Sequence, residues 1–470
     1  PWAGRSLTFT QTQGKFHTMT QEISRRKLVT GTAWAAPAVL ASTVVPVYAA
    51  SGGSECQSFE HRITAATPYQ EIEVPAGATH INFRISGGNG GGLNDYDIEK
   101  MFGRVGHIIS RGGRGAVMYG FAPVSPGQIV KVHIGLAGQA FYNKPAEGGT
   151  GYGKGGSSNI PPSSVIPADV QAKIDALSSD HKVVYSGSGG GSSAVLLGEP
   201  GDSSHDTLLV VAGGGSGSGA RAVITDSRNP ANYDGYDFSN QWDSSGHANE
   251  GMDATEGSAW AEQHYEIFFE AEIPDYRFSS SYFPYPTGNS GSSSGPGAAV
   301  VPSPIPDKFA NITFKSTSAT TIRTDIVSGT AGSEGAQGNG ADGVAAYGYA
   351  TAARLKNDPD DGVEHPHFVS GYIVSGGGGA GYNSGGSGAS LALGYEVHKI
   401  GSPGEDASHV SMRLTSGAGG SGASFSSPLM GESSWHYNHY VYGDLYTVKD
   451  GWFEYDFCTS EPAEGPIIPA

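Results

Sequence analysis

From Asp206 to Gly219 the chain reads DTLLVVAGGGSGSG, an apolar run that passes directly into a tract of glycine and serine. The apolar run predicts a short buried β-strand. No turn residue stands between this strand and the glycines. The same order, a strand followed at once by a glycine tract, recurs at residues 81–92, 183–191, 372–379 and 410–420. We therefore expect this unit to define the architecture of the chain.

Glycine makes the composition unusual. The chain contains 73 glycines in 470 residues, roughly double the average usage of about 7%. Hydrophobic residues make up 37% of the chain and aromatic residues 10%. Because a disordered chain would lack aromatic and β-branched runs of this kind, we expect folded elements separated by the glycine tracts.

Two structures are open to these tracts. Gly/Ser runs behave as flexible linkers, but a linker does not explain why each tract abuts a strand without a polar spacer. The alternative is a packed bundle of extended threefold helices with polyproline-II geometry. That conformation has no internal hydrogen bonds, so each tract would bond its neighbours, which the missing Cβ atoms allow to approach closely. We favour the bundle, and we expect its single Asn, Ser or Tyr interruptions to point outward.

The strand patterns predict a mainly β fold. Residues 70–74 and 129–135 alternate polar and apolar side chains, as half-buried strands do. Residues 449–458 predict a closing strand, which would lie near the first strand at 59–63 if Cys56 and Cys458 form a disulfide. The predicted fold class is antiparallel β-sandwich strands that feed a bundle of polyglycine-II-like helices.

One short helix is predicted from Pro167 to Ser178. Val170, Ile174 and Leu177 fall on one helical face, and we expect this helix to be a lid on a sheet edge. Residues 226–300 are rich in Tyr, Asp, Ser and Pro, and they predict a long insertion with little regular structure.

The first 49 residues predict an export signal. Arg25, Arg26 and Lys27 precede an apolar run from Leu28 to Val47, and small residues then suit a signal peptidase. The paired arginines fit a twin-arginine signal, although the basic region of a general secretory signal would look similar. We expect translation to start at Met19, and the exported protein to contain no membrane span.

The domain organisation follows from these boundaries. We expect residues 1–49 to be upstream sequence and signal peptide, residues 50–458 to be a single glycine-rich β unit, and residues 459–470 to be a disordered tail. Cys56 and Cys458 are the two cysteines, and they lie at the two ends of this unit. In an oxidising compartment they predict one disulfide that closes the whole unit. The alternative is two unrelated buried thiols.

Charge excludes two classes of partner. The formal net charge is -18, and residues 1–49 carry five Lys/Arg and one Glu, so the rest of the chain is more acidic still. Such a surface repels the phosphates of nucleic acids and anionic membrane surfaces.

The glycine-rich motifs do not predict a cofactor site. Gly148 to Lys154 resembles a phosphate-binding loop, but Gly155 stands where that loop needs Ser or Thr for a metal. Residues 291–295 match a serine nucleophile motif by letters only, because no strand and helix flank them. His365 and His367 lie beside several acidic residues, which could form a cation site. A solvated acidic turn with ordinary histidines is the better interpretation of this segment. We assign no catalytic, cofactor or metal residue.

Residues 189–197, an acidic turn and residues 208–219 together resemble secreted glycine-rich surface proteins of actinobacteria. They are more distantly similar to the extracellular glycine-rich region of anaplastic lymphoma kinase-type receptors. The resemblance covers residues 59–220 best and 310–458 loosely. It implies a β-sandwich associated with polyglycine helices and a displayed binding surface. It transfers no functional residue, and the chain lacks the kinase and transmembrane parts of those receptors.

These patterns lead to three functional hypotheses. The first is an exported structural or adhesive protein whose partner is cell-wall glycan or another surface protein. The second is a carbohydrate-binding module or glycan hydrolase; a hydrolase would need two carboxylates about 5–10 Å apart across a cleft. The third is a non-folding matrix filler. Aromatic residues of the insertion and of a later segment form the expected binding surface. They are Trp242, Tyr282, Phe283, Tyr285, Trp435, Tyr437 and Tyr440.

Overall fold

The protein is described by a computed structural model. The described residues are 59–92, 112–225, 288–302, 308–355, 366–397, 409–430, 434–437 and 449–459, apart from single positions and short gaps within these ranges. The omitted positions are 142, 178–180, 200–201, 293, 310–311, 314 and 319. The predicted export signal, most of the predicted insertion and the tail lie outside the described residues.

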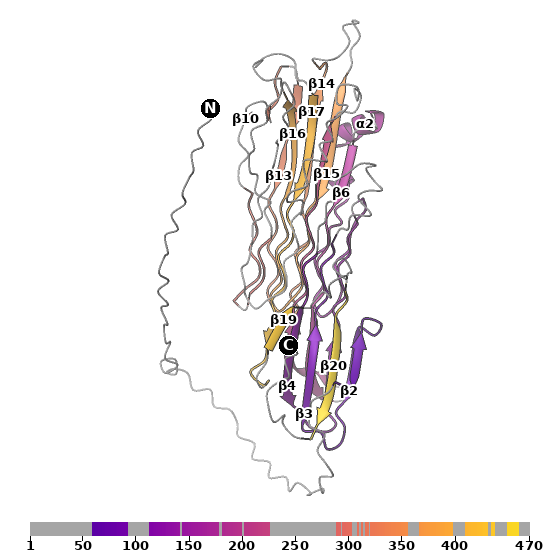
Figure 1. The fold of residues 1–470 in the computed structure, drawn as a ribbon, viewed down its shortest axis with the longest axis vertical. Helices are drawn as coiled ribbons and strands as arrows, with labels where there is room; N and C mark the ends of the chain where they lie inside the picture. The colour runs from indigo at the N-terminus through magenta and orange to yellow at the C-terminus, as the bar shows by residue number, and fades with distance from the viewer. Residues whose placement is uncertain are drawn as a thin grey trace, which may run out of the picture. The chain divides into compact units, whose positions relative to one another are not determined.

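The described part of the chain is mainly β, as predicted, and its strands form two β-sandwiches. Two sheets, which we call sheets 1 and 2, face each other in the first sandwich (Figure 1). Sheet 1 has the order β1 (His61–Thr64), β20 (Trp452–Cys458), β3 (His80–Ser86), β4 (Ala116–Pro123) and β19 (Ser434–Tyr437). Sheet 2 has the order β18 (Phe425–Ser426), β8 (Asp202–Ala212), β7 (Ser193–Glu199), β5 (Ile129–His133) and β2 (Tyr69–Glu73).

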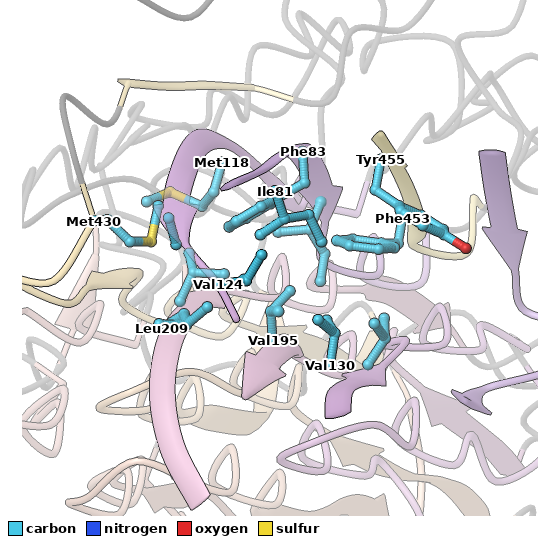
Figure 2. Close-up of a cluster of buried hydrophobic side chains, with 14 of the residues drawn as sticks. Ile81, Phe83, Met118, Val124, Val130, Val195, Leu209, Met430, Phe453 and Tyr455 are labelled. Atoms are coloured by element: carbon cyan, nitrogen blue, oxygen red, sulfur yellow. The ribbon is translucent and has the colours of Figure 1, made fainter. Parts of the chain in front are cut away.

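The core of the first sandwich lies between these sheets (Figure 2). Sheet 1 contributes Phe83 and Phe453, which are fully buried, and sheet 2 contributes Val130 and Val195. These residues come from alternate positions of their strands, so the intervening side chains point to the outer faces. The predicted closing strand is confirmed, because β20 pairs with β1 in antiparallel register, with His61 opposite Tyr455.

The second sandwich is built in the same way from sheets 3 and 4. Sheet 3 has the order β12 (Thr320–Arg323), β14 (Ala345–Ala352), β15 (His367–Val374) and β6 (His181–Tyr185). Sheet 4 has the order β10 (Lys308–Phe309), β11 (Ile312–Thr313), β16 (Ser390–Val397), β17 (His409–Ser416) and β9 (Arg221–Thr225), and β13 (Asp325–Val327) also pairs with β16. Its core includes Ala346 and Ile373 from sheet 3 with Met412 and Leu414 from sheet 4.

The predicted helix is present as α2 (Ala168–Leu177), preceded by a short 3-10 helix, η1 (Pro162–Ser164). Val170 and Ile174 are buried against Tyr347 and Tyr372. These tyrosines belong to β14 and β15, the inner strands of sheet 3, so the helix covers a face of the sheet. The expected position on a sheet edge is therefore wrong, because the apolar side of the helix meets a row of aromatic rings that only the pairing of β14 with β15 assembles.

Three glycine tracts carry the chain from one sandwich to the other. Residues 186–192 join β6 to β7, residues 213–220 join β8 to β9, and residues 417–424 join β17 to β18. Each tract starts directly after a strand, as the sequence predicted.

The C-terminal end of the predicted insertion at 226–300 lies within the described residues. Residues 288–300 lack regular strands, but they contribute to the glycine tracts: the Gly288 N–H donates to the Ala418 carbonyl (2.8 Å), and the Gly297 N–H to the Ser384 carbonyl (2.9 Å). Their Ser/Gly composition resembles a loop, yet the same composition suits a packed tract. Residues 226–287 lie outside the described ranges.

Candidate functional site

The glycine tracts pack together into one hydrogen-bonded body, which we call the glycine bundle. It contains residues 87–92, 112–115, 135–140, 146–158, 186–192, 213–220, 288–300, 328–344, 375–389 and 416–424. Apart from a few turns these residues lie outside helices and long strands and are mostly buried, and many of their backbone N–H groups donate to carbonyls of other tracts. This arrangement contradicts the linker alternative, in which the amides would face solvent.

The direction of donation repeats every three residues, which is clearest in tract 375–381. Successive N–H groups point to three different neighbouring tracts in turn, with N···O distances of 2.8 to 3.1 Å. Ser375, Gly378 and Gly381 donate to tract 338–344; Gly376 and Gly379 donate to tract 416–424; Gly377 and Ala380 donate to tract 186–192.

Tract 186–192 repeats the rule with its own three neighbours. Gly187 and Gly190 donate to tract 213–220, Ser188 and Gly191 to tract 135–140, and Gly189 and Ser192 to tract 146–158. A chain with three residues per turn places every third N–H on the same side. The N–H groups of each of these tracts are therefore divided among three neighbouring tracts, and further tracts donate to its carbonyls.

Glycine is required by the closeness of these contacts. A Cβ atom built on Gly190 would lie nearer than 3.0 Å to the Gly88 carbonyl, and one on Gly214 nearer than 3.0 Å to the Gly190 carbonyl. Real Cβ atoms essentially never come closer than 3.0 Å to such atoms. The atoms in the way belong to the backbone, so a side chain cannot rotate aside to relieve the clash. Close packing of interiors makes such overlaps destabilising.

Several Asn and Ser interruptions do not point outward as predicted, although Asn289 and Asn339 are exposed. Asn89, Ser188 and Ser216 are each 0% exposed. The Asn89 side-chain oxygen accepts from the Gly115 N–H (2.9 Å), and the Ser188 hydroxyl donates to the Glu147 carbonyl (2.5 Å). These short polar side chains replace a backbone partner inside the bundle, since a buried N–H or carbonyl needs a hydrogen bond.

Two tyrosine interruptions do reach the surface, and they lie over the outer face of sheet 2. Tyr152 and Tyr382 sit at turns of the bundle, are partly exposed, and pack against the buried residues Ala194 and Val211. The ring of Tyr382 stacks on Phe425 of β18, with centroids 4.4 Å apart and planes 12° from parallel.

The outer face of sheet 2 carries further aromatic residues in a single cross-strand row. Antiparallel pairing places Tyr69 opposite His133, and the row continues through the two buried residues named above to Phe425. His133 contacts Tyr69 (4.7 Å between centroids) and Tyr152 (5.3 Å). We call Tyr69, His133, Tyr152, Tyr382 and Phe425 the aromatic face.

Charged groups lie in the next rows of the same face. Lys131 forms a largely buried ion pair with Asp206, its Nζ atom lying 2.9 Å from each carboxylate oxygen. The Tyr69 hydroxyl donates to Glu71 (2.5 Å), and this bond is the main reason that the pKa of Tyr69 rises to about 12. Burial lowers the pKa of His133 below its ordinary value, and the nearby Asp206 carboxylate opposes that shift. The two carboxylates closest to the rings therefore already have partners.

The binding surface predicted from sequence is not assembled by the described residues. Trp435 and Tyr437 lie on β19, an edge strand of sheet 1. The other five predicted residues lie outside the described ranges: Trp242, Tyr282, Phe283, Tyr285 and Tyr440. The aromatic face shares no residue with this set.

The aromatic face could not be predicted from the sequence, because its members are far apart in the chain. The one available signal was the alternation at 129–135, which correctly placed Lys131 and His133 on one side of β5. Tyr152 and Tyr382 stand out only as aromatic residues inside glycine tracts.

The remaining motifs that the sequence suggested either belong to the glycine bundle or lie outside the described residues. Gly149 and Gly155 of the loop that resembles a phosphate-binding motif are bonded to each other within the bundle (2.8 Å). Ser292 and Gly295 close a small turn by two backbone hydrogen bonds. Within the described ranges no three His, Cys, Asp or Glu residues are grouped as a metal site requires, and His365 lies beyond them.

Cys458 ends β20 and is 1% exposed, whereas Cys56 precedes the first described residue. Their pairing therefore stays a prediction. Among the described helices, none has the length and apolar character needed to cross a membrane. No protein-family model and no curated protein matches the chain.

Proposed function

We propose that this chain is an exported structural or adhesive protein, in which the glycine bundle holds two β-sandwiches as one stiff unit at the cell surface or in the medium. The observation that carries the proposal is the threefold hydrogen bonding of the bundle. A tract that is hydrogen-bonded to neighbours on several sides resists bending and has few open conformations, which suits a protein that must keep two β-sandwiches at a fixed separation.

The proposal includes polyglycine-II geometry for the tracts. Two observations support it: the period of three in the direction of donation, and the absence of hydrogen bonds between near neighbours within tract 375–381. Backbone approach at positions such as Gly190 agrees with a packing that only glycine permits.

Export is the second element of the proposal. The basic residues before Leu28 and the apolar run after them would direct the chain across the membrane, and the Cys56–Cys458 disulfide would form on the far side. Two features of the structure support the pairing: β1 begins five residues after Cys56, and β1 is the neighbour of the strand that ends at Cys458.

The test is localisation of the chain translated from Met19 in a bacterium that has both export routes. We expect a shortened protein in the medium or on the cell surface. Replacing Arg25 and Arg26 by lysine should stop export through the twin-arginine route, while a general secretory signal would tolerate the change. Full-length protein that stays in the cytoplasm would refute the proposal.

A second candidate function, carbohydrate binding, is favoured by one observation. Partly exposed rings lie together on the aromatic face, and the nearest carboxylates, Glu71 and Asp206, are held by other side chains. A hydrolase needs two carboxylates free to act on a glycosidic bond. The face is therefore better suited to binding a glycan than to cleaving one.

A further inference from the structure

We infer that the aromatic face of sheet 2 binds an uncharged polysaccharide chain laid across the strands. This inference deepens the adhesive role proposed above and rests on it. It differs from the surface predicted by sequence, because it uses Tyr69, His133, Tyr152, Tyr382 and Phe425, which the structure places together.

The shape of the row suits a linear ligand. Tyr69 and Phe425 occupy the two edge strands of sheet 2, and three strands lie between them. Neighbouring strands are about 4.8 Å apart, so the row is about 19 Å long. Its middle is made of the small or fully buried residues Ala194 and Val211. Tyr152 and Tyr382 pack against these two residues, so aromatic rings follow the row from one edge strand to the other and offer a continuous platform to one extended chain.

The rings are held in place before any ligand arrives. Tyr382 is fixed at its backbone by the Ala423 carbonyl (2.9 Å) and at its ring by Phe425. Tyr152 donates its backbone N–H to the Ser192 carbonyl (2.8 Å). The bundle thus supplies fixed turns that carry these two tyrosines. A ligand that binds pre-organised side chains loses less affinity to the ordering of the protein.

The chemistry of the face favours sugars over a purely apolar ligand. A tyrosine ring offers an apolar body with a polar edge, which matches a sugar ring that has C–H faces and hydroxyl edges. Tyr69 is 48% exposed, and its hydroxyl is already directed by Glu71. That carboxylate keeps lone pairs that can accept hydrogen bonds from ligand hydroxyls.

Charge decides which polysaccharides fit. Beside the rings, Glu71 and Glu73 are exposed, the ammonium group of Lys131 is paired with Asp206, and that of Lys154 is paired with Glu147. The face is therefore negative, in agreement with the net charge of -18. Anionic chains are repelled, and an uncharged chain is not.

The test is a binding assay with the full exported chain and three probes: microcrystalline cellulose, chitin and polygalacturonate. We expect the protein to bind at least one of the two uncharged polymers and to leave the anionic polymer unbound. The double variant Tyr69→Ala/Phe425→Ala should bind the uncharged polymer about tenfold more weakly or worse. The matched control is Trp452→Ala, which removes a partly exposed ring from sheet 1 of the same sandwich and should leave binding unchanged.

Thermal unfolding of each variant shows whether it is folded, and Tyr69→Ala alone serves if the double variant is not. Binding that survives in Tyr69→Ala and in the double variant would overturn the inference. Failure of the unaltered protein to bind cellulose and chitin, or binding of polygalacturonate alone, would also overturn it. Each of these results leaves the proposed function standing if the chain is still exported, so the two failures are distinguishable.

Discussion

Gly189 lies directly against the backbone carbonyl of Gly378, so closely that a Cβ atom on Gly189 would overlap it. The two residues belong to tracts that enter the bundle from β6 and from β15, neighbouring strands of sheet 3. We expect Gly189→Ala to lower the free energy of unfolding by about 1–3 kcal/mol, because the clashing atom cannot move without its whole tract. Chemical denaturation measures this change.

The control for that variant is Gly295→Ala. Gly295 also lies at a turn of the bundle, but a Cβ atom there would meet nothing within 4 Å. Its effect should stay within about 0.5 kcal/mol. Equal losses of stability in the two variants would show that the tracts are not packed as described.

Asn89→Ala tests the buried polar interruptions. The Asn89 side chain accepts from the Gly115 N–H inside the bundle, so its removal leaves a buried donor without a partner. Such a loss lowers stability by about 1–3 kcal/mol. Asn289→Ala, at an exposed position of another tract, is the matched control and should be nearly neutral. An unchanged unfolding midpoint for Asn89→Ala would contradict the role assigned to Asn89.

The ion pair of Lys131 and Asp206 should behave as a buried pair. Removing the ammonium by Lys131→Met leaves the Asp206 carboxylate largely buried and uncompensated, with an expected loss of about 3–5 kcal/mol. The double variant Lys131→Met/Asp206→Leu should recover much of this loss, because no lone charge remains. A double-mutant cycle on unfolding free energies checks this, and additive effects would contradict it.

Two partly buried histidines should make stability depend on pH. Burial lowers the pKa of His133 and that of His181 below their ordinary value of 6.5. The unfolded chain then binds protons more readily than the folded chain, so stability rises with pH through the interval between the folded and unfolded values. It is fully present above about pH 6.5 and is lost as the pH falls below it.

The measurement is the unfolding free energy at pH 7.5 and at pH 5.5. His133→Asn should reduce the difference between the two values, because it removes one of the two groups. The partly exposed His80 provides His80→Asn as a comparison. A larger pH dependence in His133→Asn than in the unaltered chain would contradict the stated sign.

The disulfide prediction is tested by thiol titration of the denatured, exported chain. We expect no free thiol before reduction and two after it. A bridge that encloses about 400 residues would stabilise the fold by about 5 kcal/mol on a chain-entropy estimate, so reduction should lower the melting temperature clearly. Two reactive thiols in the unreduced protein would refute the pairing of Cys56 with Cys458.

The strand-to-glycine junctions could be predicted from the sequence, because the change from apolar residues to glycine occurs between adjacent residues. At Ala212 and Val374 an apolar run ends and glycine begins, and the structure ends β8 and β15 at those residues. The single helix and the closing strand were predictable for the same reason, since their side-chain periods lie within one segment.

The contents of the bundle and of the aromatic face were not predictable in this way. Whether Asn89 points out or in depends on which tract lies beside it, and that neighbour comes from a different part of the chain. The pairing of Tyr69 with Phe425 on one row needs the register of four strand pairs at once. Sequence spacing contains no record of such a register.

The period of three in tracts 186–192 and 375–381 limits how this chain can change in length. Inserting one residue would move every later amide of the tract to the next of the three directions of donation, and each would then face the wrong neighbour. Inserting three residues would direct every later amide to the same neighbouring tract as before, one period further along. We therefore expect natural insertions and deletions in these tracts to come in multiples of three residues.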